Sequence, residues 1–189
     1  MSNQRRIVSP DSPRIGVRQT VYEDKYQLIY RATVDFGDFT KEYFVREAGE
    51  RAGIVAVRGG SVLLVKQYRF LINRPSLEVP GGGVDDGEPP EETAVRECLE
   101  ETGVRCINPR PLIFYHAGLD TTHNPTHIFY SDEVAEAPEP QSIHATEVSG
   151  HEWVPLTQCI EMIHDGQIMD AFSIIALLAY RSLAAYQLP

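Results

Sequence analysis

The chain has 189 residues, of which 42% are apolar and 23% charged, and this composition is that of a folded globular protein of ordinary domain size. A formal net charge of −10 argues against coating nucleic-acid backbones, and no apolar run reaches the roughly 18 residues that a membrane-spanning helix needs. Cys98, Cys106 and Cys159 lack the spacing of zinc ligands. We therefore expect free thiols in a reducing compartment, and a cytoplasmic protein.

The N-terminal part is rich in residues that favour strands. The runs RIGVRQTV, YQLIYRATVDF and FTKEYFVR, between Arg14 and Arg46, predict a three-stranded meander, with a turn at Gly37-Asp38 joining the last two. We expect residues 1–48 to form this meander and residues 49–189 to form the main domain. Inside that domain, GIVAVRGGSVLLVKQYRF predicts a hairpin that turns at Gly59-Gly60.

The remaining chain alternates strands with few helices. A helix is predicted from about residue 89 to 102, because proline is tolerated in a first turn and Gly103 stands where a left-handed cap belongs. PLIFYHA, THIFYS and HEWVPL predict strands, and two helices follow at about 157–164 and 170–185. Without a regular βαβ alternation, the expected fold class is α+β.

Two local patterns lead to weaker expectations. In QYRF, Tyr68 and Phe70 alternate with Gln67 and Arg69, so the aromatic pair is expected to pack in the core and the polar pair to face a site. His123 and His127 have the spacing HxxxH. Because Asn124-Pro125 between them forbids a helix, we favour a role in a loop turn or a substrate contact over zinc binding.

The most informative stretch is RECLEETG. On a helix, Glu97, Glu100 and Glu101 fall within about 100° of arc. A solvated face is one reading, but like charges at these spacings cost roughly 0.2 to 0.5 kcal/mol per pair, and they lie at the helix end where the dipole is already negative. A divalent cation offsets both penalties. Converging carboxylates therefore predict a site for Mg²⁺, with Mn²⁺ as an alternative.

The same stretch resembles the signature of a known family. The spacing of fixed positions in GGVDDGEPPEETAVRECLEETGV is that of the Nudix box, found in hydrolases that act on nucleoside diphosphates linked to another moiety. Every specified position is filled: Gly82, Glu88, Arg96, Glu97, Cys98, Glu100, Glu101, Gly103 and Val104.

The resemblance extends along most of the chain. VKQYRF, LEVPGGGVDDGE, EWVPL and GQIMDAFSIIALL are similar to the ADP-ribose pyrophosphatase branch, as is the N-terminal meander. This likeness implies an α/β/α sandwich around a mixed β-sheet and a Nudix hydrolase domain over residues 49–189. It also implies hydrolysis of the diphosphate bridge of ADP-ribose or a related nucleoside diphosphate sugar, and a homodimer whose N-terminal strands complete the partner's site.

The resemblance also implies roles for individual residues. Metal ions would be bound by three carboxylates and one backbone carbonyl, those of Glu97, Glu100, Glu101 and Gly81. Arg96 would orient the carboxylates, and Glu88 would brace the loop. Substrate contacts are expected from Arg46, Arg69 and Glu78.

Two departures from that branch leave alternatives open. An S-P-G loop is replaced by HAGLDTTHNPTH, with Ala117 in place of the proline, so the preferred sugar is not fixed. The general base is assigned to Glu147, with Glu139 and Glu152 as alternatives close in sequence. A dinucleoside polyphosphate or nucleoside triphosphate hydrolase is an alternative function, and so is a non-catalytic nucleotide-sensing domain, although the latter predicts loss of box carboxylates that are present here.

Overall fold

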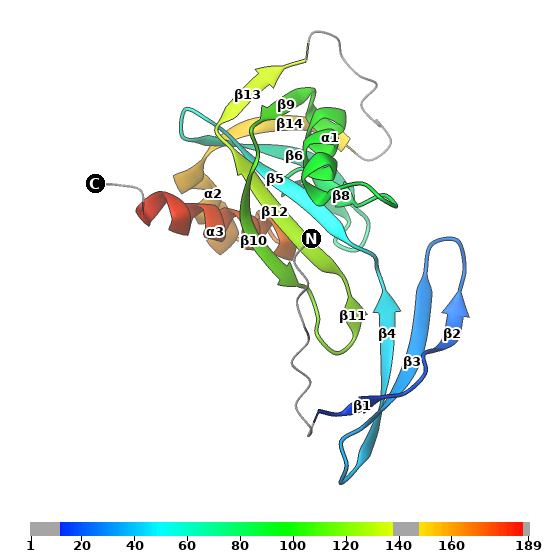
Figure 1. The fold of residues 1–189 in the computed structure, drawn as a ribbon. Helices are drawn as coiled ribbons and strands as arrows, with labels where there is room; N and C mark the ends of the chain where they lie inside the picture. The colour runs from blue at the N-terminus through cyan, green and yellow to red at the C-terminus, as the bar shows by residue number, and fades with distance from the viewer. Residues whose placement is uncertain (1–11, 138–147, 187–189) are drawn as a thin grey trace. The chain divides into compact units, whose positions relative to one another are not determined.

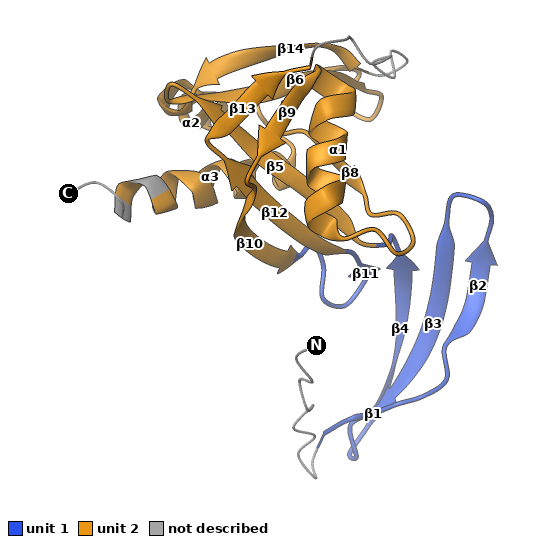
Figure 2. Ribbon diagram, turned by 45° about the horizontal axis from the view of Figure 1, so that its top comes forward, with its two compact units in different colours: residues 1–49, 116–124 blue, residues 50–115, 125–189 orange. Residues whose placement is uncertain are grey.

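The computed structural model describes residues 12–137 and 148–186, and it divides into two compact units (Figures 1 and 2). Unit 1 comprises residues 1–49 and 116–124, and unit 2 comprises residues 50–115 and 125–189. No helix in the described part of the chain is long and apolar enough to cross a membrane.

Unit 1 is a five-stranded sheet that contains the N-terminal meander. In this sheet β2, β3 and β4 pair antiparallel in sequence order, β1 pairs with the far end of β3, and β11 adds to β4 in parallel. The turn between β3 and β4 uses Gly37 at φ 91°, whose N–H donates to the Asp35 carboxylate at 2.8 Å. The strands are β1 (Arg14–Ile15), β2 (Gln19–Glu23), β3 (Leu28–Asp35), β4 (Thr40–Glu47) and β11 (Thr122–His123).

Unit 2 is built on a mixed sheet with the order β10-β12-β5-β6-β14, to which β7 and β8 add beside β6 and β5. The pairing of β12 with β5 is parallel, while β5–β6, β6–β7 and β14–β6 are antiparallel. A small second sheet joins β9 to β13. The strands are β5 (Arg51–Arg58), β6 (Ser61–Arg69), β7 (Arg74–Glu78), β8 (Gly81–Gly83), β9 (Val104–Ile107), β10 (Arg110–His116), β12 (Pro125–Ser131), β13 (Glu133–Glu136) and β14 (Val148–Pro155).

Helices cover both faces of the sheet in unit 2 (Figure 1). They are α1 (Pro90–Thr102), α2 (Leu156–His164) and α3 (Ala171–Tyr186). On one face, Ala94 and Cys98 of α1 pack against Ile54 and Leu63. On the other, Cys159 of α2 and Phe172 of α3 pack with the alternate residues of the same strands. The α+β class, with helices on both sides of a mixed sheet, is confirmed.

The expectation that Tyr68 and Phe70 of QYRF pack in the core is wrong. Tyr68 is 50% exposed and Phe70 77% exposed, whereas Gln67 is buried. The aromatic rings lie outside the core because β7 pairs along this end of β6 and leaves the hairpin tip in solvent, where the Tyr68 hydroxyl donates to Asn73 at 2.6 Å. Gln67 lies beside Glu101 of α1, and Arg69 contacts Glu78 of β7.

Candidate active site

Helix α1, which carries the three glutamates, has well-defined ends and one buried side. Pro89 and Pro90 start the helix, and Gly103 ends it at φ 72° with its N–H donating to the Leu99 carbonyl at 2.8 Å, as the sequence predicts. The side chains of Thr93, Ala94, Cys98 and Thr102 are buried, and no basic residue lies in the last turn. The last turn therefore has no basic side chain to offset the negative end of the helix dipole.

The glycines of β8 allow the backbone to approach this helix closely. A Cβ atom at Gly82 would overlap the carboxylate of Glu97. A Cβ atom at Gly81 would lie 2.6 Å from the Ala52 carbonyl oxygen and 2.8 Å from the ring of Phe172. A side chain at either position would force these neighbours apart, which gives the PGGG sequence a steric reason.

Arg96 lies at the centre of the carboxylate cluster. Its guanidinium donates to both oxygens of Glu88 at 2.9 Å, to Glu97 at 2.8 Å and to Glu100 at 3.3 Å. Hydrogen bonds from Arg96, followed by one from the Thr93 hydroxyl at 2.7 Å, lower the pKa of Glu88 to about 2. Glu88 also accepts from the Asp85 N–H at 3.4 Å, and so it ties the loop before α1 to the helix.

Glu101 has a different environment. Its carboxylate accepts from the Gly81 N–H at 3.2 Å and from the Gln67 amide at 3.4 Å, and it has no ion pair in the described part of the chain. Burial raises its pKa to about 7, and the negative charge of Glu97 adds to the rise, against the opposing hydrogen bond from Gly81. Strand alternation predicted that Gln67 faces a site, but the sequence did not identify Glu101 as its partner.

Arg69 and Glu78, both expected to contact substrate, contact each other. The guanidinium of Arg69 donates to the two oxygens of Glu78 at 2.8 and 2.5 Å. Burial of Glu78, which is 3% exposed, raises its pKa, but the hydrogen bonds and charge of Arg69 outweigh burial, so that the net pKa lies below the ordinary value. Glu78 therefore holds the fork of Arg69 in one orientation.

Arg46 and the candidate general bases were also expected at the site. Arg46 lies exposed on β4 in unit 1, where its backbone N–H donates to the Thr121 carbonyl at 2.9 Å. Glu147, the expected general base, and its alternative Glu139 lie outside the described residues. The remaining alternative, Glu152, is exposed on β14.

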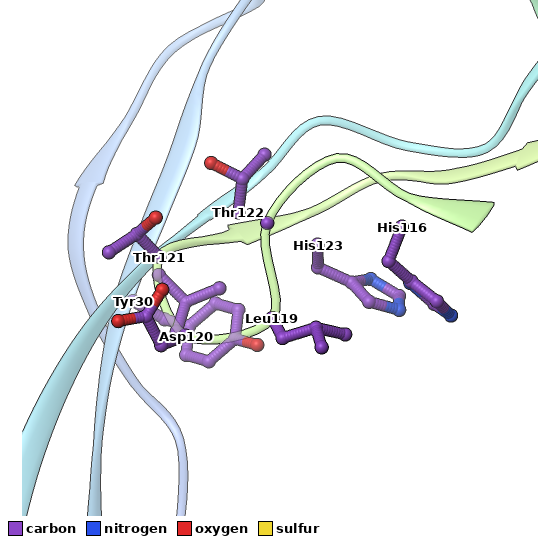
Figure 3. Close-up of a pocket in the computed structure, with 9 residues that line it drawn as sticks. Tyr30, His116, Leu119, Asp120, Thr121, Thr122 and His123 are labelled. Atoms are coloured by element: carbon purple, nitrogen blue, oxygen red, sulfur yellow. The ribbon is translucent and has the colours of Figure 1, made fainter. Parts of the chain in front are cut away.

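The loop of residues 116–124 lines a hollow of about 220 Å³ in unit 1, together with Tyr30 and Val45 (Figure 3). The imidazoles of His116 and His123 lie beside each other, with ring centroids 6.5 Å apart. His123 pairs with Glu47 at 2.5 Å, whereas His127 in unit 2 pairs with Glu50 at 2.6 Å. The HxxxH histidines thus bind separate carboxylates, and no helix joins them, as expected from Asn124-Pro125.

The donor set suits a hard divalent cation. Glu97, Glu100 and Glu101 offer carboxylate oxygens, and Gly81, the residue expected to add a backbone carbonyl, contacts Glu101 through its N–H. Among the described residues, no three His, Cys, Asp or Glu side chains already surround one point closely enough to hold an ion. Glu97 and Glu100 both accept hydrogen bonds from Arg96, at 2.8 and 3.3 Å.

Comparison with known proteins agrees with this geometry. The NUDIX domain model matches residues 48–172, and the chain belongs to the Nudix family. It is 30% identical over 167 residues to the CMP-5'-(N-acetyl-N-hydroxy-3-aminopropyl)phosphonate hydrolase of Streptomyces rubellomurinus, a match that covers 87% of this chain and 80% of the relative. It is 24% identical over 162 residues to the ADP-ribose pyrophosphatase of Bacillus subtilis, covering 85% and 88%.

A solved structure of an ADP compounds hydrolase has the same fold, with a TM-score of 0.79 at 19% identity, covering 95% of this chain and 98% of that one. The ADP-ribose pyrophosphatase of Mycobacterium tuberculosis is 27% identical over 143 residues, covering 73% and 69%. The assignment to the Nudix family and its fold is confirmed, and the two ADP-ribose pyrophosphatases support the branch inferred from the sequence.

Proposed function

We propose that this protein hydrolyses the diphosphate bridge of ADP-ribose or a related nucleoside diphosphate sugar, giving a nucleoside monophosphate and a sugar phosphate. The observation that carries the proposal is the cluster around Arg96, in which Glu97 and Glu100 are held on one side and Glu101 is left beside Gly81 without a cationic partner within ion-pairing distance among the described residues. Such a cluster of oxygen donors, complete at every box position, argues against a sensing domain that has lost catalysis.

The proposed metal is Mg²⁺, with Mn²⁺ as a substitute. Glu97, Glu100, Glu101 and the Gly81 carbonyl would hold it. When bound, such ions neutralise phosphate charge and lower the pKa of a bound water. Arg96 keeps two of the three carboxylates aligned, and Glu88, which holds Arg96 through two bonds of 2.9 Å, fixes Arg96 in turn.

Other residues would act on the substrate and on the attacking water. Arg69, whose guanidinium is oriented by Glu78, is proposed to bind a phosphate oxygen, which would orient the diphosphate for attack. Arg46 is proposed as a second substrate contact. Glu147 is proposed to accept the proton of the attacking water. Gln67 keeps the Glu101 carboxylate turned toward Gly81.

The substrate class rests on the relatives, and they differ among themselves. Two are ADP-ribose pyrophosphatases, and another hydrolyses a CMP-linked phosphonate. The match to the phosphonate hydrolase makes a cytidine nucleotide linked to a phosphonate a second candidate substrate. Dinucleoside polyphosphates and nucleoside triphosphates are weaker alternatives, because residues 14–47 form strands beyond the matched family domain.

A turnover panel tests the proposal. Purified protein with Mg²⁺ is assayed against ADP-ribose, GDP-mannose, UDP-glucose, a CMP-linked phosphonate, a dinucleoside polyphosphate and dNTPs, with nucleotide products separated by chromatography. We expect the highest kcat/KM for a nucleoside diphosphate sugar and formation of the nucleoside monophosphate. Higher kcat/KM for dNTPs, or no turnover of any compound, would contradict the proposal.

We also propose a cytoplasmic homodimer. Unit 1 leaves large apolar side chains exposed on its sheet, including Ile15, Val21 and Phe44, and such surfaces are typical of protein contacts. Three free buried cysteines are what a reducing compartment maintains. A sedimentation mass near 42 kDa, about twice the 21.2 kDa of one chain, is expected, and a monomer mass at micromolar concentration would exclude a shared site.

A further inference from the structure

Arg51 is a cation beside the carboxylates that the sequence motif does not include. It begins β5, and its guanidinium lies over the ring of Phe172 of α3, with its central carbon 4.3 Å from the ring centroid. The ring fits here because both neighbouring backbones are glycine. A Cβ atom at Gly53 or Gly81 would collide with Phe172. The stack of glycines, ring and guanidinium therefore places Arg51 next to the β8 backbone that contacts Glu101.

Arg51 lies beside the strand that meets the glutamates of α1. In the pairing of β5 with β8, Arg51 is opposite Gly83, two residues along β8 from Gly81, whose N–H donates to Glu101. The positive charge of Arg51 also opposes the effect of burial on the pKa of Glu78. Arg51 is only partly exposed, so that its charge is not fully screened by water.

Among the residues that the structure describes, the guanidinium of Arg51 nevertheless has no carboxylate partner. Within the described part of the chain, no ion pair of 4.0 Å or less and no side-chain hydrogen bond involves it. The other two arginines at the site are engaged, Arg96 by Glu88 and Arg69 by Glu78. An arginine that is held by an aromatic face and keeps its five N–H donors free is suited to bind an anion.

We propose that Arg51 is a substrate-binding residue whose guanidinium donates to a phosphate oxygen of the diphosphate group. The inference rests on the proposed function in that it takes the substrate to be a diphosphate. Stacking on Phe172 limits the rotamers of Arg51 before substrate arrives, so little side-chain entropy is lost on binding. Together with Arg69, it gives the substrate two cations in a site that otherwise carries mainly negative charge.

A purely structural role makes a different prediction. If Arg51 only covers Phe172, its replacement changes stability and leaves ligand affinity unchanged. Arg58 provides a matched control, because it lies at the other end of β5 and its guanidinium also covers an aromatic ring, that of Trp153, at 4.1 Å. Arg58 differs in that it pairs with Glu136 at 2.8 Å.

The experiment measures binding of methylenediphosphonate, a diphosphate that cannot be hydrolysed, by calorimetry in the presence of Mg²⁺. The proteins are wild type, Arg51→Gln, Arg51→Lys and Arg58→Gln. We expect Arg51→Gln to weaken binding by about tenfold or more, as for loss of a hydrogen bond to a charged group, and Arg51→Lys to restore part of it. Arg58→Gln should bind like wild type. Circular dichroism and Tm confirm that each variant is folded.

The outcomes separate this inference from the proposed function. If no nucleotide sugar is hydrolysed but diphosphonate binding still depends on Arg51, the assigned substrate is wrong and the role of Arg51 stands. Equal affinity of wild type and Arg51→Gln, or an equal loss in Arg58→Gln, would overturn the inference. So would absence of measurable binding by wild type. For any substrate that is turned over, Arg51→Gln should raise KM more than it lowers kcat.

Discussion

Glu88 and Glu101 belong to the same motif, yet their carboxyl groups are perturbed in opposite directions. Hydrogen bonds from Arg96 lower the pKa of Glu88 to about 2, whereas burial raises the pKa of Glu101 to about 7. The carboxylate of Glu88 has a cationic partner within the protein, the guanidinium of Arg96. The carboxylate of Glu101 accepts a backbone N–H and an amide, and within the described residues it has no ion pair. The difference indicates that the Glu101 side of the cluster is where an external cation contributes most.

The largest effect is expected from Glu101→Gln. The amide keeps the shape of the side chain but removes an anionic oxygen donor, so turnover should fall by more than about a hundredfold. Glu91→Gln is the control, since Glu91 is an exposed carboxylate in the first turn of the same helix. Initial rates at saturating Mg²⁺ measure both variants. Equal rates for wild type and Glu101→Gln would remove Glu101 from the mechanism.

The next largest effect is expected from Arg96→Gln. Glu88, Glu97 and Glu100 lose their shared partner, so the carboxylates lose their alignment and activity should fall by about ten- to a hundredfold. The pKa of Glu88 should rise from about 2 toward the ordinary value of a glutamate, which NMR titration of the carboxyl carbon can follow. Arg105→Gln, an exposed arginine on β9, is the control. If the pKa of Glu88 were unchanged in Arg96→Gln, Arg96 would not be the cause of its low value.

A smaller effect is expected from Gly82→Ala. The added methyl group would overlap the Glu97 carboxylate and displace it, and we expect activity to fall by about tenfold while the fold is retained. Gly83→Ala is the matched control, because a Cβ atom there meets nothing within 4 Å. Initial rates of the two variants provide the measurement. Similar rates for both would show that the approach of β8 to Glu97 is unimportant.

The smallest effect concerns stability of the metal-free protein. Because the pKa of Glu101 is about 7 when folded, against 4.5 for an unperturbed glutamate, the folded state binds the proton more tightly. The contribution of the Glu101 carboxyl group to the free energy of unfolding is fully present below about pH 4.5 and is lost as pH rises through about 7. This contribution is up to about 3 kcal/mol. Denaturant unfolding in EDTA should show wild type losing stability relative to Glu101→Gln from pH 5 to 8. If the stability of wild type and of Glu101→Gln changed with pH in parallel, the raised pKa of Glu101 that burial predicts would be refuted.

Much of the fold follows from local chemistry in the sequence. Gly103 ends α1 because glycine adopts φ 72° without strain, and Gly59-Gly60 turns the β5–β6 hairpin at positive φ angles. The spacing of the glutamates in the Nudix box places them on one side of α1. This follows from the helical period alone and does not depend on the surroundings of the helix.

The environment of each site residue could not be predicted in the same way. The sequence does not distinguish Glu97, which pairs with Arg96, from Glu101, which contacts Gly81. The difference depends on tertiary contacts, since Gly81 of β8 and Gln67 of β6 both donate to Glu101. Exposure of Tyr68 and Phe70 depends on where β7 pairs. Arg51 belongs to no motif, and its position depends on contact with Phe172, about 120 residues away along the chain.

The central claim is that Glu97, Glu100 and Glu101 together hold a divalent cation. Titration of Mn²⁺ followed by electron paramagnetic resonance measures this directly, without substrate, in wild type, Glu101→Gln and the Glu91→Gln control. We predict saturable binding that is weakened at least about tenfold in Glu101→Gln and unchanged in Glu91→Gln. Equal Mn²⁺ affinity in all three proteins, or no saturable binding by wild type, would contradict the account.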